Sequence, residues 1–88
     1  MGWTIEWDKR VERQLARLGR DNARRIRDYM MQRVARVEDP RSLGKALHGR
    51  LSTYWRYRVG DYRVICSLED AVCKVLVVRI GHRREVYR

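Results

Sequence analysis

The pattern of apolar and polar positions predicts one strand followed by two helices in the first half of the chain. Residues 3–7 alternate apolar and polar side chains, which is the period of a half-buried strand. Apolar residues then recur every three or four positions in two stretches. Asp8 can cap the first helix, which ends at Gly19, and Asp21 can cap the second, which cannot pass Pro40. These stretches predict a helical hairpin.

The second half of the chain has the pattern of strands. Residues 41–53 show no sustained period, and we interpret them as a connecting loop with room for one short turn. Beyond them, β-branched and aromatic residues gather in three segments. These predicted strands span residues 54–59, 62–68 and 72–80. Gly60 and Asp61 separate the first two strands and are typical of a two-residue hairpin turn. The last segment is almost entirely apolar, as expected of a central strand.

This order of elements predicts an α+β fold of the type β-α-α-β-β-β. We expect a mostly antiparallel, twisted sheet with the helical hairpin packed on one face. A chain of 88 residues is too short for two separate cores, so we interpret residues 1–88 as a single domain. The sequence has no internal repeat and no low-complexity segment.

The charge of the chain indicates a polyanionic partner. Lys and Arg number 21 against 11 Asp and Glu, which leaves a net charge of +10. Most of these residues are arginines, whose guanidinium group binds phosphate through two parallel hydrogen bonds. On the predicted helices they lie opposite the apolar stripe, and we interpret those as a solvated surface. The helical arginines are Arg13, Arg17, Arg20, Arg24, Arg27 and Arg36.

The cysteine and apolar content sets further limits. Cys66 and Cys73 are too few and too close for a disulfide scaffold, and we expect both to be reduced core residues. No cluster of Asp, Glu, His or Cys has the spacing of a metal site, so we expect no metal and no cofactor. No apolar run is long enough for a signal peptide or a membrane span, which favours a cytoplasmic protein without membrane contact.

A two-residue turn at Gly60 and Asp61 places three arginines on one face of the hairpin. In that register Arg58 lies opposite Arg63, and Arg56 lies opposite an apolar residue. Like charges directly across a strand pair are destabilising unless an anion compensates them. The predicted face is therefore either a phosphate-binding surface or a solvated face of the sheet.

The C-terminal segment favours the phosphate-binding interpretation. His82, Arg83 and Arg84 follow the last predicted strand, and Tyr87 comes three residues later. An imidazole that donates a proton, guanidinium groups that stabilise charge and a ring that stacks on a base are what phosphodiester cleavage requires. His48 stands in the predicted loop without such neighbours, and we interpret it as a surface residue.

Two motifs in combination resemble the RelE/ParE toxin superfamily. The first is W-R-Y-R-V-G-D-Y-R-V at residues 55–64, and the second is I-G-H-R-x-x-V-Y at residues 80–87. The resemblance covers essentially the whole chain. For a RelE-type member it implies the toxin of a type II toxin–antitoxin system, an endoribonuclease that cleaves mRNA in the ribosomal A site. The reaction it implies is metal-free attack of the ribose 2′-hydroxyl on the adjacent phosphate.

The resemblance also assigns roles to individual residues. Arg56 and Arg58 stand where RelE has two catalytic lysines, and Arg63 matches its transition-state arginine. Arg83 corresponds to a second catalytic arginine and Tyr87 to a base-stacking tyrosine. The resemblance implies that His82 serves as general acid and that substrate contacts come from Arg56, Arg58, Arg84 and Tyr87. The general base stays open, because a guanidinium is a poor proton acceptor, and Glu85 is an alternative base.

The resemblance implies three partners: an acidic RelB-like antitoxin, the ribosome and mRNA. Two other functions remain open from the sequence. A ParE-like member would inhibit DNA gyrase and cleave nothing, although such members generally lack the basic set that this chain keeps. A non-catalytic RNA-binding module needs only the net charge and the exposed rings.

Overall fold

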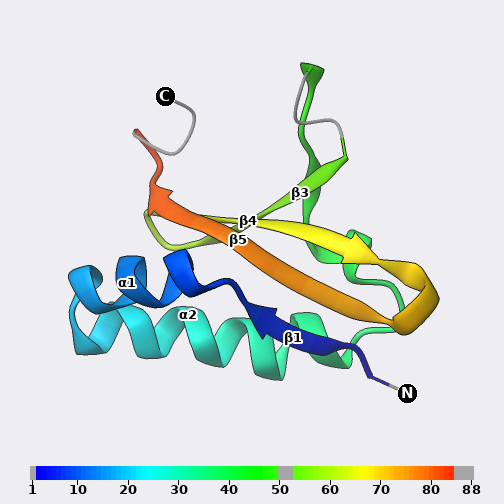
Figure 1. Cartoon of the computed structure of the whole chain (residues 1–88), viewed down its shortest axis with the longest axis horizontal. Coiled ribbons are helices and arrows are strands. Elements are labelled where there is room, and N and C mark those ends of the chain that lie inside the picture. The colour runs from blue at the N-terminus through cyan, green and yellow to red at the C-terminus, as the bar shows by residue number, and fades with distance from the viewer. Residues whose placement is uncertain (1, 50–52, 85–88) are drawn as a thin grey trace.

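A computed structural model of the chain describes residues 2–49 and 53–84. Figure 1 shows its helices and strands. The helices are α1 (Lys9–Leu18) and α2 (Arg20–Gln32). The strands are β1 (Thr4–Trp7), β2 (Lys45–Ala46), β3 (Tyr54–Val59), β4 (Tyr62–Glu69) and β5 (Lys74–His82). Tyr87 and Glu85 lie outside the described residues.

Within the described ranges, five strands form one mixed sheet in the order β1-β5-β4-β3-β2. β1 pairs in parallel with β5, and all other neighbours are antiparallel. Both labelled helices lie on the same side of this sheet (Figure 1). The predicted α+β class and the helical hairpin on one face are confirmed.

The helical hairpin follows its sequence signals except at two points. The second helix was expected to continue to Pro40, but α2 ends at Gln32 and Val34–Arg36 forms a 3-10 turn. Asp8 caps α1 by accepting a hydrogen bond from the backbone N–H of Arg10 at 2.9 Å. Gly19 ends α1 with a positive φ of 87°, a conformation that few other residues adopt at low cost. The capping role predicted for Asp21 is wrong, since Gly19 is also the residue that precedes α2. Asp21 lies in the first turn of α2, where its negative charge interacts favourably with the helix dipole.

The hydrophobic core lies between the helices and one face of the sheet. Its most deeply buried side chains come from α1, α2, β3, β4 and β5. They include Val11, Leu15, Ile26, Met30, Tyr57, Val64, Val75 and Val77. Tyr57 is completely buried, and its hydroxyl donates a hydrogen bond of 2.9 Å to the carbonyl of Pro40. Burial raises the pKa of this phenol above its ordinary value, so the hydroxyl stays a donor.

The segment predicted as a loop contains the short turn that the sequence allowed and, in addition, a strand that it did not predict. Pro40–Leu43 forms a 3-10 turn that Asp39 caps, and Lys45–Ala46 forms the edge strand β2. β2 pairs with β3, and Leu47 continues the contact through a backbone hydrogen bond to Tyr54. A strand of two residues has no detectable period, and therefore only its pairing with β3 reveals it.

The last strand begins later than the sequence predicted. Asp70–Val72 forms a 3-10 turn, so Val72 belongs to the turn and is 64% exposed. Cys73 ends that turn with a φ of 49° and is exposed. The prediction of a core cysteine is therefore correct for Cys66, which is buried, and wrong for Cys73. β5 runs from Lys74 to His82.

Candidate nucleic-acid interface

The β3–β4 hairpin has the register that the turn sequence predicts. Val59 pairs with Tyr62 across Gly60 and Asp61, and Arg58 pairs with Arg63. Gly60 has a φ of 60°, which the turn requires and which glycine adopts without strain. The two arginines therefore lie directly opposite each other on one face of the sheet.

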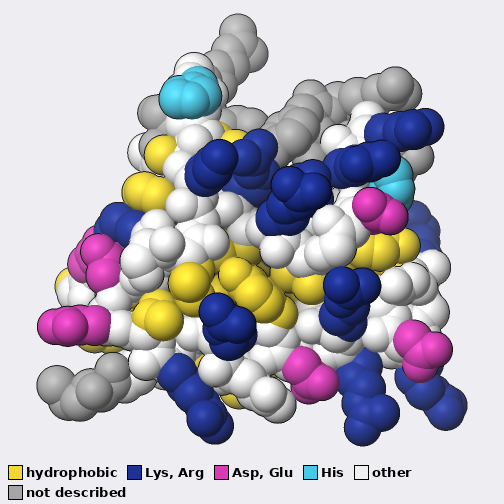
Figure 2. Space-filling view, turned by 180° about the vertical axis from the view of Figure 1, so that it is seen from behind, with side chains coloured by type: hydrophobic (Ala, Val, Ile, Leu, Met, Phe, Trp, Pro, Cys, Tyr) yellow, Lys and Arg dark blue, Asp and Glu magenta, His cyan; other side chains and the backbone are white. Residues whose placement is uncertain are grey.

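Basic side chains cover this face over four neighbouring strands. One row across the sheet joins Lys45, Arg56, Ile65 and Arg79 through consecutive pairs. Paired residues share a face, so these side chains lie with those of the Arg58–Arg63 pair. We call Lys45, Arg56, Arg58, Arg63 and Arg79 the basic face. Figure 2 shows Lys and Arg side chains gathered in a band across one side of the molecule, beside hydrophobic side chains.

A β-bulge turns Arg79 onto the basic face. Cys66 of β4 pairs with Val77 of β5, whereas the next residue, Ile65, pairs with Arg79. Val78 is thus the extra residue on β5. An extra residue reverses which face the following side chains occupy. Without the bulge, Arg79 would share the helix-covered face with Val77.

The basic face has an apolar centre. Leu47 and Ile65 are 9% and 5% exposed and form a small cluster separate from the main core. Tyr54 and Val78 pack against this cluster and stay partly accessible. Arginine stems pack well on apolar surface while the guanidinium groups remain in water. The surface therefore offers both apolar contact and positive charge, as nucleic-acid interfaces do.

Arg63 is held in place by the turn beside it. Its Nη1 donates hydrogen bonds to the carbonyl of Gly60 at 3.1 Å and to the carbonyl of Tyr62 at 3.0 Å. These contacts orient the guanidinium group before any ligand binds. A preorganised donor of this kind stabilises developing charge without a cost of reorganisation.

The segment after β5 is hydrogen-bonded to the same turn. The backbone N–H of Arg83 donates to the carbonyl of Asp61 at 2.8 Å. Arg83 and Arg84 are both exposed. The structure therefore brings the predicted site residue Arg83 next to the hairpin that carries Arg58 and Arg63. The predicted role of Tyr87 falls on a position outside the described residues.

His82 lies on the opposite face of the sheet from the basic face. It pairs with Tyr62, which packs against the main core. The Tyr62 hydroxyl accepts a hydrogen bond of 3.5 Å from Nδ2 of Asn22 in α2. The His82 and Tyr62 rings meet edge to face at 5.9 Å. The imidazole Nδ1 accepts a hydrogen bond of 3.3 Å from the backbone N–H of Arg84. The structure thus separates His82 from Arg58 and Arg63 by the thickness of the sheet.

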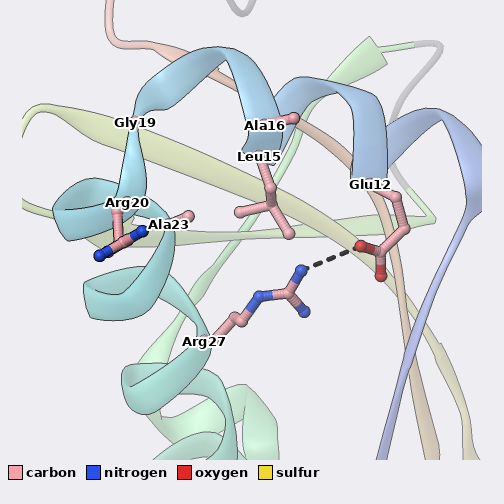
Figure 3. A pocket seen from close by; sticks show the side chains of 7 residues that line it. All are labelled: Glu12, Leu15, Ala16, Gly19, Arg20, Ala23 and Arg27. Atoms are coloured by element: carbon pink, nitrogen blue, oxygen red, sulfur yellow. Dashed lines mark hydrogen bonds and ion pairs between the residues drawn. The ribbon is translucent and has the colours of Figure 1, made fainter.

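A groove lies on the helical hairpin, away from the basic face. Figure 3 shows this groove between α1 and α2, which is lined by Glu12, Leu15, Ala16, Gly19, Arg20, Ala23 and Arg27. Arg27 donates to Glu12 at 2.9 Å and lies 5.3 Å from the centre of the Trp7 ring. This helical arginine therefore has a structural contact, whereas Arg13 and Arg17 are exposed as predicted.

Residues 2–49 and 53–84 contain no group of three or more His, Cys, Asp or Glu side chains that could hold a metal ion. No helix in these ranges is long and apolar enough to cross a membrane.

Sequence reasoning missed two members of the basic face. Lys45 fell in the segment predicted as a loop, and the side of the sheet that Arg79 occupies was not determined. No local signal marks either residue, because each depends on pairing with a distant strand. The predicted members Arg56, Arg58 and Arg63 do share one face.

Solved structures of toxins have the same fold. The toxin–antitoxin complex RelBE2 from Mycobacterium tuberculosis matches with a TM-score of 0.86 and 23% identity over 94% of this chain and 100% of that one. A mutant of Escherichia coli toxin RelE in the free state matches with a TM-score of 0.72 and 20% identity, covering 99% of this chain and 92% of that one. At these identities the likeness establishes the fold.

The sequence places the chain in a family. It matches the family model described as ParE toxin of the type II toxin–antitoxin system parDE over residues 5–87. The chain therefore belongs to this toxin family, within the RelE/ParE superfamily that the motifs indicated. It is also 32% identical over 50 residues to the toxin RelG of Mycobacterium tuberculosis, a match that spans 57% of this chain and 58% of RelG.

Proposed function

We propose that this toxin is a ribosome-dependent endoribonuclease that cleaves mRNA in the A site. The observation that carries the proposal is the basic face, where arginines from β3, β4 and β5 surround an apolar centre. Guanidinium groups bind phosphate oxygens, and the apolar centre provides a surface for bases or sugars. The likeness to toxin RelG and the RelE-type motifs at residues 55–64 and 80–87 support a nuclease over other toxins of this fold.

In the proposed reaction, the ribose 2′-hydroxyl attacks the adjacent phosphate and the 5′-oxygen of the next nucleotide leaves. The products are a 2′,3′-cyclic phosphate and a new 5′-hydroxyl end. Arg63 neutralises the pentacovalent phosphate together with Arg56 or Arg83. Its two hydrogen bonds to turn carbonyls hold it ready for this role. Arg58 and Arg84 bind neighbouring phosphates, and Tyr87 stacks on a base.

The geometry supports the arginines more strongly than it supports His82 as the proton donor. The imidazole is on the helix-covered face, and its Nδ1 is engaged by the N–H of Arg84. The backbone of Arg83 is hydrogen-bonded to the hairpin turn, and Arg83 is the next candidate for donating the proton. The variant His82→Gln separates these assignments: a general acid predicts single-turnover cleavage about 100-fold slower with an altered pH dependence. Cleavage at the wild-type rate would exclude His82 as the proton donor and leave Arg83 as the next candidate.

We further propose an acidic antitoxin as the partner in the cell, and a cytoplasmic location. The solved complexes of RelBE2 and of archaeal RelE with RelB show that toxins of this fold assemble with antitoxins. A net charge of +10 favours an acidic segment that lies across the basic surface. Binding of the antitoxin should then weaken as salt rises to physiological ionic strength. Complex formation that is indifferent to salt would contradict this proposal.

The nuclease proposal is tested with purified toxin, assembled ribosomes and a defined message. We expect cuts on ribosome-bound mRNA, none on the same RNA alone, and 2′,3′-cyclic phosphate at the new ends. Cleavage should persist in EDTA under conditions that keep ribosomes assembled. Activity that is lost in EDTA and restored by Mg²⁺ under those conditions would overturn the metal-free reaction.

A second candidate function is inhibition of DNA gyrase without cleavage of RNA. The match to the ParE family model over residues 5–87 favours it, as does the separation of His82 from the basic face. Mapping transcript ends and gyrase cleavage complexes after induction distinguishes the two functions. New transcript ends alone support the nuclease, and gyrase complexes alone support the second candidate. RNA binding with neither effect would indicate a non-catalytic module.

A further inference from the structure

Arginines from three separate elements converge on the β3–β4 turn. From α2, Arg25 lies against Gly60, where an added Cβ would stand 3.1 Å from its Nη1 and 3.2 Å from its Cζ. From β4, Arg63 donates to the carbonyl of Gly60 at 3.1 Å. From the segment after β5, the N–H of Arg83 donates to the carbonyl of Asp61 at 2.8 Å. One short turn is therefore in contact with the side chains of Arg25 and Arg63 and with the backbone of Arg83.

Arg25 reaches this turn from the helix side of the sheet. Its side chain is exposed, and the ion pairs found in residues 2–49 and 53–84 do not include it. Gly60 allows this approach, because it has no side chain and its φ of 60° suits the turn. Arg25 and Arg63 each place a guanidinium group at Gly60, and bringing two like charges together costs free energy that an anion would recover. The arrangement is therefore suited to a ligand with a negative charge at the tip of the hairpin.

We propose that Arg25, which lies against Gly60, forms a phosphate-binding site that continues the basic face around the hairpin tip onto α2. Its ligand is a backbone phosphate of single-stranded RNA, bound outside the reacting phosphate. RNA is favoured because successive phosphates can occupy the basic face and this site together, whereas a single free anion occupies one of them. The proposal depends on the proposed function only in taking RNA as the polyanion.

The site predicts that Arg25 contributes one phosphate contact. The probe is a short fluorescent RNA in which every 2′-hydroxyl is methylated, so that the proposed reaction cannot cleave it. Binding to the full-length toxin is measured by anisotropy over a range of salt concentrations. Each contact to a single-stranded phosphate contributes about 0.7 to the slope of log K against log salt. We expect Arg25→Gln to reduce the magnitude of this slope by about 0.7.

The matched control is Arg24→Gln, which makes the same charge change one residue earlier on α2. Arg24 is exposed and lines a groove with Arg20 and Arg27. The control should keep the wild-type slope, and circular dichroism should show both variants folded. An unchanged slope for Arg25→Gln, or an equal decrease in both variants, would overturn the site. So would a wild-type toxin that does not bind the probe.

The outcome for this site is independent of the outcome for cleavage. A smaller slope in Arg25→Gln from a toxin that cuts no ribosome-bound message would keep the phosphate site and reject the nuclease. Cleavage by a toxin whose Arg25→Gln slope is unchanged would keep the nuclease and reject the site.

Discussion

The two faces of the sheet differ in how their side chains affect the stability of the fold. On the helix-covered face, Tyr57, Val64 and Val77 are completely buried and pack under α1 and α2. On the basic face, alternate residues of the same strands carry charge, and Arg58 lies directly opposite Arg63. Burial of apolar surface stabilises the first arrangement, whereas opposed like charges destabilise the second. The Arg58–Arg63 pair on the basic face is thus a cost in stability that a bound anion would offset.

The separation of the faces is not complete, and the exceptions are informative. The basic face has its own small apolar cluster at Leu47 and Ile65, which supports the sheet where the helices do not reach. The helix-covered face ends in the polar group of Tyr62, His82 and Asn22. The helix-covered face therefore becomes polar near the hairpin tip, where Arg25 and the backbone of Arg83 also contact the turn.

The largest effect on stability is expected from the helix-covered face. Leu15 is 1% exposed, and Leu15→Ala should lower the free energy of unfolding by about 2–5 kcal/mol, because it removes buried contacts and leaves a cavity. Urea unfolding followed by circular dichroism measures the change. Arg17→Ala on the same helix is exposed and should change stability by less than about 0.5 kcal/mol. Equal effects of the two variants would contradict the placement of the core.

The basic face should show the opposite behaviour, with a large effect on activity and little on stability. Arg63→Ala should reduce cleavage by about 100- to 1000-fold, because it removes a preorganised donor to the reacting phosphate. Growth arrest on induction should be lost while the unfolding transition stays close to that of the wild type. Arg13→Ala, an exposed arginine on α1, is the control with the same charge change and should keep full activity. Normal cleavage by Arg63→Ala would remove this residue from the site.

A smaller effect tests the cost of the opposed charges. Arg58→Gln relieves the repulsion with Arg63 and should raise the free energy of unfolding by about 0.2–1 kcal/mol at low salt. The gain should shrink as salt rises, because exposed charges are screened. The same variant should bind RNA more weakly. If Arg58→Gln were less stable than the wild type at low salt, Arg58 would stabilise the fold, contrary to this prediction.

The smallest effect concerns the ion pair between Arg41 and Asp70, which joins the 3-10 turns Pro40–Leu43 and Asp70–Val72. Arg41 holds Asp70 through two hydrogen bonds of 2.9 and 2.7 Å, and these bonds keep the pKa of the carboxyl below its ordinary 3.8. Since the folded-state pKa is the lower one, the contribution is present above pH 3.8 and disappears as the pH falls through the folded-state value. Asp70→Asn should therefore lose less stability on acidification than the wild type, as thermal unfolding between neutral and acid pH would show. A curve for Asp70→Asn that runs parallel to the wild-type curve over this pH range would contradict it.

The sequence by itself determined the features that depend on local signals. Periods of two and of about 3.6 residues located β1, α1, α2, β3 and β4, and Gly60-Asp61 set the register of the hairpin. That register alone placed Arg56, Arg58 and Arg63 on one face. Two motifs then indicated the toxin superfamily, which the family match over residues 5–87 confirmed. Each inference needed only neighbours in the chain or a turn of defined length.

Only the tertiary structure decided the features that depend on contacts between distant segments. β2 exists because it pairs with β3, and the bulge at Val78 sends Arg79 to the basic face and His82 to the helix-covered face. The approach of Arg25 to Gly60 depends on how α2 packs beside the hairpin. The physical reason is the period of a strand, in which one extra residue moves every later side chain to the other face. Such a shift is set by pairing across the sheet, and no local pattern in β5 records it.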